Sequence, residues 1–344
     1  MADSTRVNLP FLSTNLPGIG GVLRTTDDDF IVDEEPAYPA SGAGDHVFVR
    51  IEKRGLNTAQ AVQAIAKALR IRERDIGIAG MKDRHAVTRQ WISLPPPSTP
   101  EAALALSLDD IRILEATRHG HKLRTGHVRA NRFILRVRSV SEHARERAAA
   151  ILECLARPPG APNWYGEQRF GKYGDNAEKG RALLRGEQRS DRRMDRFFIS
   201  ALQSELFNAW LVARMTDGLY ARVLDGDVLH KVGGGMFTCE DAAVDEPRLL
   251  AGELVVTGPM FGTKMRAPTG AAAEREQAIL AAAGLTREDF AKVAQIAEGT
   301  RRDASIAVRE SAIQTLDDNS LEISFALPAG AYATAVMREV MKSE

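Results

Sequence analysis

The residues best suited to chemistry lie in a short loop within residues 77–94, which is rich in glycine and in charge. Asp83 is the only carboxylate of this segment, and Lys82, Arg84 and His85 beside it carry or can gain a positive charge. A carboxylate that is buried near cations is held ionised, because an opposite charge within a few ångströms favours the charged form. Asp83 is therefore a candidate nucleophile or general base, with a role as a turn or helix-cap residue as the alternative.

Two predicted strands position this loop. Residues 76–78 and 88–94 carry isoleucine, threonine and tryptophan and are typical of short strands. Gly77 and Gly80 indicate places where the backbone turns sharply or approaches another group closely. Charged loops on a rigid scaffold often hold catalytic groups, so the setting favours a functional role for Asp83.

The composition limits the class of protein. The chain has 344 residues, of which 44% are hydrophobic, and this is enough for two domains with cores. The two cysteines, Cys154 and Cys239, lack metal-ligand spacing and indicate a reduced protein without structural zinc. The sequence shows neither a leader peptide nor a run of membrane-spanning length. We therefore expect a soluble, cytoplasmic protein without a membrane partner, and favour a monomer.

Charge is balanced overall but uneven along the chain. Lys plus Arg equals Asp plus Glu at 46 each, yet residues 112–138 contain eight Lys or Arg and three His against one acid, and residues 27–35 contain six acids and no base. Concentrated positive charge suits a nucleic-acid backbone, with a solvated charged loop as the alternative. His119 and His121 could suggest a metal pair, but no acid stands in ligand register, so no metal site is predicted.

Hydrophobic periodicity predicts an α+β protein. Residues 45–53 alternate cleanly, with Val47, Val49 and Ile51 on one side, and predict a half-buried strand. A helix capped by Asn57 or Thr58 follows it. Further strands are expected at 18–34, 111–117, 132–140 and 321–327, and further helices at 101–106, 142–156, 177–184, 193–215, 271–283, 287–297 and 332–342.

The segment Arg157-Pro158-Pro159-Gly160 breaks these patterns and predicts a domain boundary. Beyond it the sequence becomes mainly helical until the strand at 321–327, whose alternation resembles the first half of the chain. We infer that this last strand returns to the first sheet. The predicted domains are residues 1–158 with 306–344, and residues 159–305.

Several motifs, in order, resemble the TruD family of tRNA pseudouridine synthases. The run Gly80-Met81-Lys82-Asp83-Arg84-His85-Ala86-Val87-Thr88, followed by Gln90-Trp91, resembles the family signature that holds the catalytic Asp. The segment from Pro162 to Gly171 resembles a second signature, which opens the inserted domain of the family. Asn131-Arg132-Phe133 resembles the GNxF motif of the family, with Ala130 where glycine is usual. Phe30 and Phe325 also fall on family motifs.

The resemblance implies roles for individual residues. Asp83 is the expected catalytic residue, Asn131 is expected to contact the target nucleotide, and Phe133 is expected to stack on its base. Phe30 and Phe325 are expected around the substrate, and Arg24 matches a position where the family commonly has a basic residue near the catalytic acid. The residues that we expect to contact the RNA backbone are Lys82, Arg84, His85, Arg118, Lys122, Arg124, Arg169 and Lys172.

The resemblance also implies an α+β fold. It consists of a pseudouridine synthase catalytic domain with a mixed, mainly antiparallel sheet and a second, more helical TRUD-type domain, flanking a basic cleft. The implied reaction converts uridine 13 in the D arm of tRNA to pseudouridine on a flipped-out base. It breaks the N1–C1′ bond and rejoins the uracil through C5, so neither a cofactor nor a metal is required.

Two other functions stay open from the sequence. One is a catalytically silent RNA-binding protein on the same fold. The other is a phosphate-transferring enzyme that uses Gly166–Tyr173, a near match to the phosphate-binding P-loop. Tyr173 stands where that loop needs a hydroxyl group to hold magnesium, which disfavours the second alternative.

Overall fold

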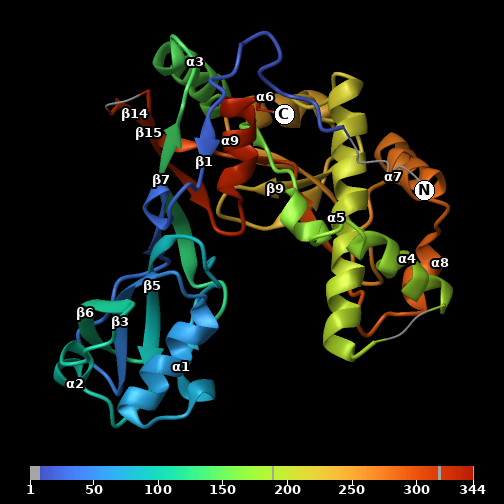
Figure 1. Ribbon diagram of the computed structural model, residues 1–344. Coiled ribbons are helices and arrows are strands. Elements are labelled where there is room, and N and C mark those ends of the chain that lie inside the picture. The colour runs from blue at the N-terminus through green and yellow to red at the C-terminus, as the bar shows by residue number, and fades with distance from the viewer. Residues whose placement is uncertain (1–7, 188–189, 317–318, 344) are drawn as a thin grey trace. The chain divides into compact units, whose positions relative to one another are not determined.

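The structure, a computed structural model, describes residues 8–187, 190–316 and 319–343 (Figure 1). The chain divides into two compact units. Unit 1 consists of the described residues of Met1–Asn15, Glu153–Ala307 and Thr334–Glu339. Unit 2 consists of those of Leu16–Leu152, Val308–Ala333 and Val340–Glu344. The described helices are not long and apolar enough to cross a membrane.

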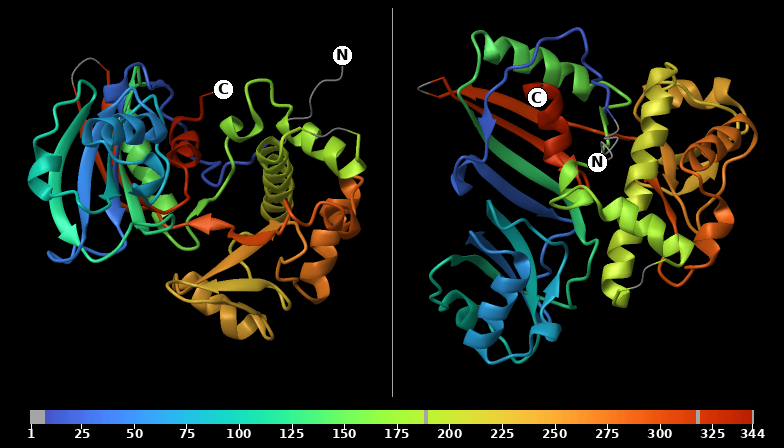
Figure 2. Two further views of the ribbon diagram at one scale, coloured as in Figure 1. Left: turned by 90° about the horizontal axis from the view of Figure 1, so that it is seen from below. Right: turned by 45° about the vertical axis from the view of Figure 1, so that its right-hand side comes forward.

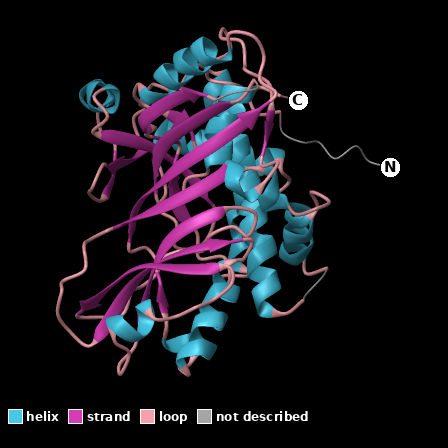
Figure 3. Ribbon diagram, turned by 60° about the vertical axis from the view of Figure 1, so that its left-hand side comes forward, coloured by secondary structure: helices cyan, strands magenta, loops and turns pink. Residues whose placement is uncertain are grey.

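Unit 2 is built on a nine-stranded sheet, which is drawn in magenta in Figure 3. Its strands are β1 (Val22–Leu23), β2 (Phe30–Pro36), β3 (His46–Arg54), β4 (Gly77–Ile78), β5 (Val87–Leu94), β6 (Ile111–His119), β7 (Val128–Arg138), β14 (Arg309–Thr315) and β15 (Leu321–Pro328). The order is β14-β15-β7-β2-β5-β3-β6, with β1 beside β7 and β4 beside β5. Within the described residues, β2 and β5 form the one parallel pair. The predicted α+β class with a mixed, mainly antiparallel sheet is confirmed.

Helix α1 (Thr58–Leu69) covers one face of this sheet at β3 and β5 (Figure 1). Its residues Ile65 and Ala66 pack with Val49 and Ile51 of β3, so the predicted inward side of that strand is confirmed. Asn57 caps the helix, because its side chain accepts a hydrogen bond of 2.9 Å from the Gln60 amide. The other helical segments of the first half are η1 (Asp27–Asp29), η2 (Glu73–Asp75), α2 (Pro100–Leu104) and α3 (Ala144–Ala156).

The last strand returns to the first sheet, as predicted. β15 pairs antiparallel with β7 and places Phe325 opposite Phe133 and Leu327 opposite Asn131. It also pairs with β14 on its other side. The sheet that carries Asp83's neighbours is therefore completed by a strand from the end of the chain.

Unit 1 combines helices with a smaller sheet. Its elements are β8 (Ala161–Pro162), η3 (Glu167–Phe170), α4 (Asn176–Arg185), α5 (Arg192–Thr216), β9 (Val228–Lys231), β10 (Met236–Thr238), α6 (Ala242–Leu250), β11 (Leu254–Met260), α7 (Gly270–Ala282), α8 (Arg287–Ala291), β12 (Thr300–Asp303), β13 (Ser305–Ile306) and most of α9 (Ala333–Met341). The strand order is β10-β9-β11-β12, and β13 pairs with β8. The sequence did not predict these strands, and helix α8 is shorter than the predicted 287–297.

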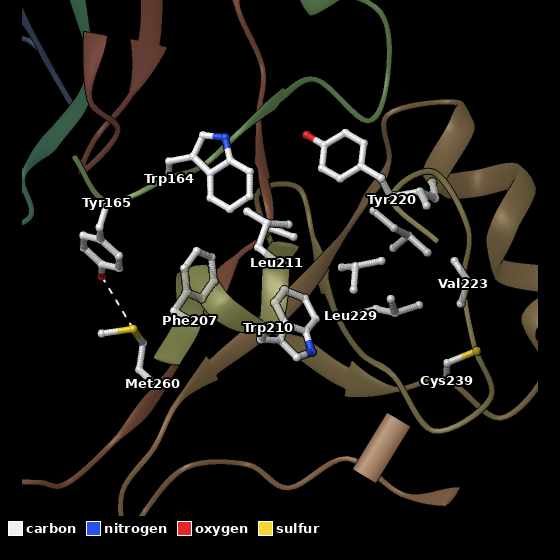
Figure 4. Packing of buried hydrophobic residues seen from close by; sticks show 14 of the residues in the cluster. Trp164, Tyr165, Phe207, Trp210, Leu211, Tyr220, Val223, Leu229, Cys239 and Met260 are labelled. Atoms are coloured by element: carbon white, nitrogen blue, oxygen red, sulfur yellow. Dashed lines mark hydrogen bonds between the residues drawn. The ribbon is translucent and has the colours of Figure 1, made fainter. Parts of the chain in front are cut away.

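The core of unit 1 is formed where α5 lies against β11, and Figure 2 shows α5 as the long yellow-green helix. Phe207, Trp210 and Leu211 of α5 pack with Trp164 in this core (Figure 4). Gly258 of β11 permits the close approach, since a Cβ atom at this position would lie only 2.5 Å from the Trp210 ring.

Candidate active site

The loop that contains Asp83 lies over one face of the unit 2 sheet. Strand register places Glu34 of β2 opposite Asn131 of β7, and Lys53 of β3 opposite Thr88 of β5. Side chains of directly paired residues project to the same side of a sheet. The contacts between this face and the loop fix the position of the loop.

Consecutive residues of the loop are bound by the turn that joins β3 to α1. The contacts are from the Lys82 amide to Thr58 Oγ1 (2.8 Å), from Lys53 Nζ to the Asp83 carbonyl oxygen (2.8 Å) and from Arg84 Nε to the Gly55 carbonyl oxygen (3.0 Å). Main-chain atoms of the loop therefore have tertiary partners on both sides of the Asp83 side chain.

The Asp83 carboxylate itself is open to solvent. Its side chain is 56% exposed, and its Oδ2 atom lies 3.2 Å from an Arg24 guanidinium nitrogen. Burial among cations, the setting in which the sequence analysis made Asp83 a candidate nucleophile or base, is not found in the structure. An exposed ion pair contributes at most about 1 kcal/mol to stability, so this contact orients Asp83 without enclosing it.

Arg24 is held in an unusual conformation beside Asp83. Its φ angle of 62° lies in the left-handed region, which costs a residue with a side chain roughly 1 kcal/mol. The guanidinium carbon lies 3.9 Å from the centroid of the Phe30 ring, which is cation–π geometry. The Arg24 Nε atom is buried and has no hydrogen-bond partner among the described residues.

Three phenylalanines form a cluster on the same face. The Phe133 ring centroid lies 6.2 Å from that of Phe30, in an edge-to-face arrangement, and 5.8 Å from that of Phe325. All three are buried: Phe325 has no exposed surface, and Phe30 and Phe133 are 3% and 7% exposed. The sequence predicted all three to surround the substrate. In this conformation Phe325 cannot touch a ligand, because Phe133 and its other neighbours cover it, and it supports Phe133 instead.

Three buried polar atoms near the loop lack hydrogen-bond partners among the described residues. They are Asn131 Oδ1, Thr88 Oγ1 and Gln90 Nε2. The orientation of Gln90 is fixed, since Thr58 Oγ1 accepts from the Lys82 amide and donates to Gln90 Oε1 at 2.9 Å. Buried polar groups are nearly always satisfied, so these three atoms are exceptions on this face of the sheet.

Lys82 is a correction to the predicted RNA contacts. Its ammonium group forms an ion pair with the Glu34 carboxylate, which is fully buried, and the Lys82 side chain is only 8% exposed. Glu34 also accepts a hydrogen bond of 3.1 Å from the Trp91 amide. Lys82 therefore fixes the loop to β2 and is not free to bind phosphate, because leaving Glu34 would strand a buried carboxylate.

Comparisons with known proteins identify the family of this chain. The family model described as tRNA pseudouridine synthase D (TruD) matches residues 6–191 and 177–340. The chain is 50% identical to tRNA pseudouridine synthase D of Anaeromyxobacter dehalogenans, over 98% of this chain and 97% of the relative. It is 41% identical to the protein of that name from Thermus thermophilus, over 97% and 92% of the two chains. The chain belongs to the TruD family.

A solved structure from Methanosarcina mazei, assigned to tRNA pseudouridine synthase D, has the same fold. Its TM-score is 0.78 at 22% identity, and the match covers 98% of this chain and 97% of that one. At this identity the likeness supports the TruD fold alone.

The other positively charged residues that we predicted to contact RNA near Asp83 differ in their exposure to solvent. Arg84, His85, Arg118 and Arg124 are exposed. Lys122 is half-buried, and its ammonium group donates to the Arg74 carbonyl oxygen at 2.6 Å. The exposed residues of this TruD-family chain therefore keep charge available for a polyanion.

Part of the predicted basic segment is neutralised in space by the acidic one, through two ion pairs. Arg138 forms an ion pair with Asp29, and Arg129 forms one with Glu35. These pairs form because β7 lies beside β2, which carries Glu35, and beside η1, which carries Asp29. The imbalance of charge along the sequence therefore overstates the positive charge of the folded surface.

The histidines of this segment gather around Tyr38. His119 Nδ1 accepts from the Ser41 amide at 3.1 Å, and the two Nε2 atoms of His119 and His121 lie 3.2 Å apart. Burial, with His121 and His46 nearby, lowers the pKa of His119. Since His119 Nδ1 accepts a hydrogen bond, neutral His119 carries its proton on Nε2 and donates it to His121. The described residues contain no group of three or more ligand side chains able to hold a metal.

Two further predicted RNA contacts lie in unit 1. Arg169 is half-buried and donates to Ser200 and Ser204 of α5, so its guanidinium group connects the end of the second TruD signature to this helix. This corrects its predicted role, because its Nε atom and one terminal nitrogen already have internal partners. Lys172 is exposed and lies 5.7 Å from the ring of Tyr173, which is 79% exposed.

The sequence analysis missed three buried residues of this site, Lys53, Glu34 and Gln90. A signal existed for Lys53, since it continues the inward alternation of Val47, Val49 and Ile51. A lysine on the buried side of a strand is rare and indicates a specific role. Glu34 and Gln90 sit on strands whose pairing the sequence alone did not supply.

Proposed function

We propose that this TruD-family chain converts uridine 13 of tRNA to pseudouridine, with Asp83 as its catalytic carboxylate. The observation that carries the proposal is the ion pair of Asp83 with Arg24. The loop that carries Asp83 is held in place by hydrogen bonds with Lys53 and Thr58. The name shared by the relatives, tRNA pseudouridine synthase D, supports tRNA as the substrate. The enzyme is then an isomerase.

The isomerisation needs a carboxylate and a confined site. The N1–C1′ bond breaks, the uracil turns, a C5–C1′ bond forms, and the proton lost from C5 is balanced by one gained at N1. Asp83 supplies the carboxylate, as a nucleophile toward the base or the sugar or as a base. A bound nucleotide would cover its exposed side chain and exclude water from it.

The neighbouring residues fit a flipped-out uridine. Removing a base from its stack costs a few kcal/mol, and stacking on an aromatic ring returns roughly 1–3 kcal/mol. Phe133 is the proposed platform, with Phe30 and Phe325 as its supports. Asn131 has an open Oδ1 atom, which can accept the N3–H group of uracil.

The RNA backbone would be held by exposed positive side chains. We retain Arg84, His85, Arg118, Arg124 and Lys172 for this role. Lys122 is a weaker candidate because it is half-buried and its single ammonium group already binds a carbonyl oxygen. Each phosphate contact contributes to a salt-dependent affinity, so binding of tRNA should weaken steeply as salt is raised.

The reaction balances in atoms and electrons without an added group. We therefore propose that it proceeds without a metal or a nucleotide cofactor. Activity that is retained in EDTA without ATP would support this, and a strict requirement for magnesium and ATP would favour a phosphate-transferring enzyme. We further propose that the protein acts in the cytoplasm as a monomer.

The test is to map pseudouridine in an unmodified tRNA transcript that carries uridine 13. The wild type should form pseudouridine at that position, and a transcript with cytidine there should gain none. A product at another position would overturn the assignment to uridine 13. Asp83→Asn should bind the tRNA without forming product, whereas equal binding and no product from both proteins would identify a silent RNA-binding protein.

A further inference from the structure

Lys53 is a fully buried lysine beneath the Asp83 loop. Its side chain has no exposed surface, and its ammonium group donates to the carbonyl oxygens of Asp83 at 2.8 Å and Leu56 at 2.5 Å. Lysine is almost never fully buried unless it is paired, because removing an ammonium ion from water is costly. Here the two partners are main-chain oxygens, one in the Asp83 loop and one in the turn between β3 and α1.

The charges around Lys53 come from two segments, the Asp83 loop and η1. The loop supplies the carboxylate of Asp83 and the ammonium group of Lys82, and η1 supplies the carboxylate of Asp27. The Asp27 carboxylate faces the same turn, since a Cβ atom at Gly55 would lie 3.4 Å from it. From the neighbouring strands Lys53 is paired with the uncharged Thr88 and Ile111. Among the described residues, no carboxylate lies within 4.0 Å of the Lys53 ammonium group.

We propose that Lys53 is a positioning residue for Asp83: its buried ammonium group fixes the main chain of the loop and keeps a positive charge beneath the carboxylate. The inference rests on the proposed catalytic role of Asp83. The ammonium group binds the carbonyl oxygen of the same residue whose side chain must reach the uracil. Hydrogen bonds from a charged donor are about twice as strong as neutral ones, so the charged form holds the loop more firmly.

The charge of Lys53 responds to pH within a range that an assay can reach. Burial lowers its pKa to about 8, against the opposing effect of Asp83 and Asp27. The ammonium form is present below this pH and is lost above it. The wild-type rate of the chemical step should therefore fall as the pH rises through about 8.

The first experiment compares Lys53→Met with Lys67→Met. Lys67 lies on α1 in the same unit and is exposed, so the same substitution there controls for the loss of one lysine. Single-turnover rates on tRNA should fall about 10- to 100-fold for Lys53→Met, since a misplaced catalytic group costs up to about 100-fold. The KM for tRNA should change less than about threefold, because the binding of tRNA does not depend on Lys53. The alkaline decline should disappear, whereas Lys67→Met should keep the wild-type rate and profile.

The second experiment needs no substitution at Lys53 and keeps the proposal testable if Lys53→Met fails to fold. The method is NMR spectroscopy with the carbonyl carbon of aspartate and the backbone nitrogen of arginine isotopically labelled. A spectrum that correlates the two labels shows only the three Asp–Arg peptide bonds of the chain, at residues 83–84, 191–192 and 195–196. An Arg84→Lys variant removes and so identifies the signal of the first bond. In the wild type, the Asp83 carbonyl resonance should shift with a midpoint near pH 8, together with one lysine side-chain resonance.

The outcomes separate this inference from the proposed function. A wild-type rate and pH profile in folded Lys53→Met, with Asp83→Asn inactive, would overturn the positioning role and leave the proposed function standing. An Asp83 carbonyl resonance that does not move between pH 7 and 9 would also overturn it. If wild-type protein forms no pseudouridine, or Asp83→Asn forms it at the wild-type rate, the proposed function fails instead.

Discussion

Two Arg–Asp pairs of this protein are built in opposite ways. Arg214 and Asp227 in unit 1 are joined by two hydrogen bonds, of 3.0 and 2.7 Å, and their side chains are 2% and 4% exposed. Arg24 and Asp83 in unit 2 share one contact of 3.2 Å, and Asp83 is more than half exposed. The first pair is closed on all sides, and the second leaves its carboxylate accessible.

The surroundings of the two pairs explain the difference. Arg214 also donates to the carbonyl oxygens of Leu219 and Arg222, and Asp227 also accepts from the Leu224 amide, so the buried charges are satisfied. Arg24 keeps a buried Nε atom without a partner among the described residues and a strained backbone angle. A structural ion pair uses all its hydrogen-bonding capacity internally, whereas a site retains some for a ligand.

The largest expected effect is on activity and comes from Asp83→Asn. Pseudouridine formation should fall at least about 1000-fold, because the nucleophile or base is lost. The free energy of unfolding should change by less than about 1 kcal/mol, since the pair is exposed. Rapid-quench assays and urea unfolding measure the two quantities, and a large loss of stability would show that Asp83 is a structural residue.

The reverse pattern is expected for Asp227→Asn. Arg214 would remain buried with its charge uncompensated, which costs about 3–5 kcal/mol. Urea unfolding should show this loss, while the activity per folded molecule at low temperature stays close to that of the wild type. Unchanged stability would mean that the two pairs are energetically equivalent despite their geometry.

Two variants at Arg24 should separate the contribution of its side chain to activity from the effect of its backbone conformation on stability. Arg24→Ala and Arg24→Gly should both lower the single-turnover rate about tenfold, equivalent to roughly 1.4 kcal/mol, because Asp83 loses its orienting partner. The glycine variant should be the more stable by about 1 kcal/mol, since glycine adopts a positive φ angle without strain. Equal stabilities in thermal unfolding would argue against strain at this position.

The smallest expected effect concerns His119 and the pH dependence of stability. Its folded-state pKa is lowered from 6.5, so the unfolded chain binds a proton more readily and acid favours unfolding. The free energy of unfolding should therefore fall as the pH drops through 6.5 toward the folded-state value. His119→Phe should reduce this slope and His143→Phe, at an exposed position, should not. Equal slopes in urea unfolding for the two variants would contradict the assignment.

Local pattern predicted the elements around Asp83 well. The inward side of β3 and the Asn57 cap of α1 follow from periodicity and from local hydrogen bonding, which a sequence displays directly. The strands of unit 1 were missed because several are very short, such as Met236–Thr238, and because Gly258 interrupts the signal of β11. Short strands are specified mainly by what they pack against.

The sequence could not predict which side chains from distant parts of the chain pair with the residues of the site. Lys82 appeared free for RNA because its partner Glu34 lies on another strand. The exposure of Asp83 and the burial of Phe325 likewise depend on how β15, the loop and β7 come together. Residue types identified the chemistry of the site, and tertiary packing determined which side chains are available to perform it.

The place of β15 in the sheet has a consequence for biosynthesis. This strand is made long after β2, β5 and β7, yet it lies between β14 and β7 and contributes Phe325 beneath Phe133. While the chain is still attached to the ribosome, the Asp83 loop and the strands β2, β5 and β7 have already been made, but one long edge of β7 stays open. Messages that end early would yield a polypeptide with an unpaired, aggregation-prone edge, so premature termination should produce insoluble protein instead of a partly active enzyme.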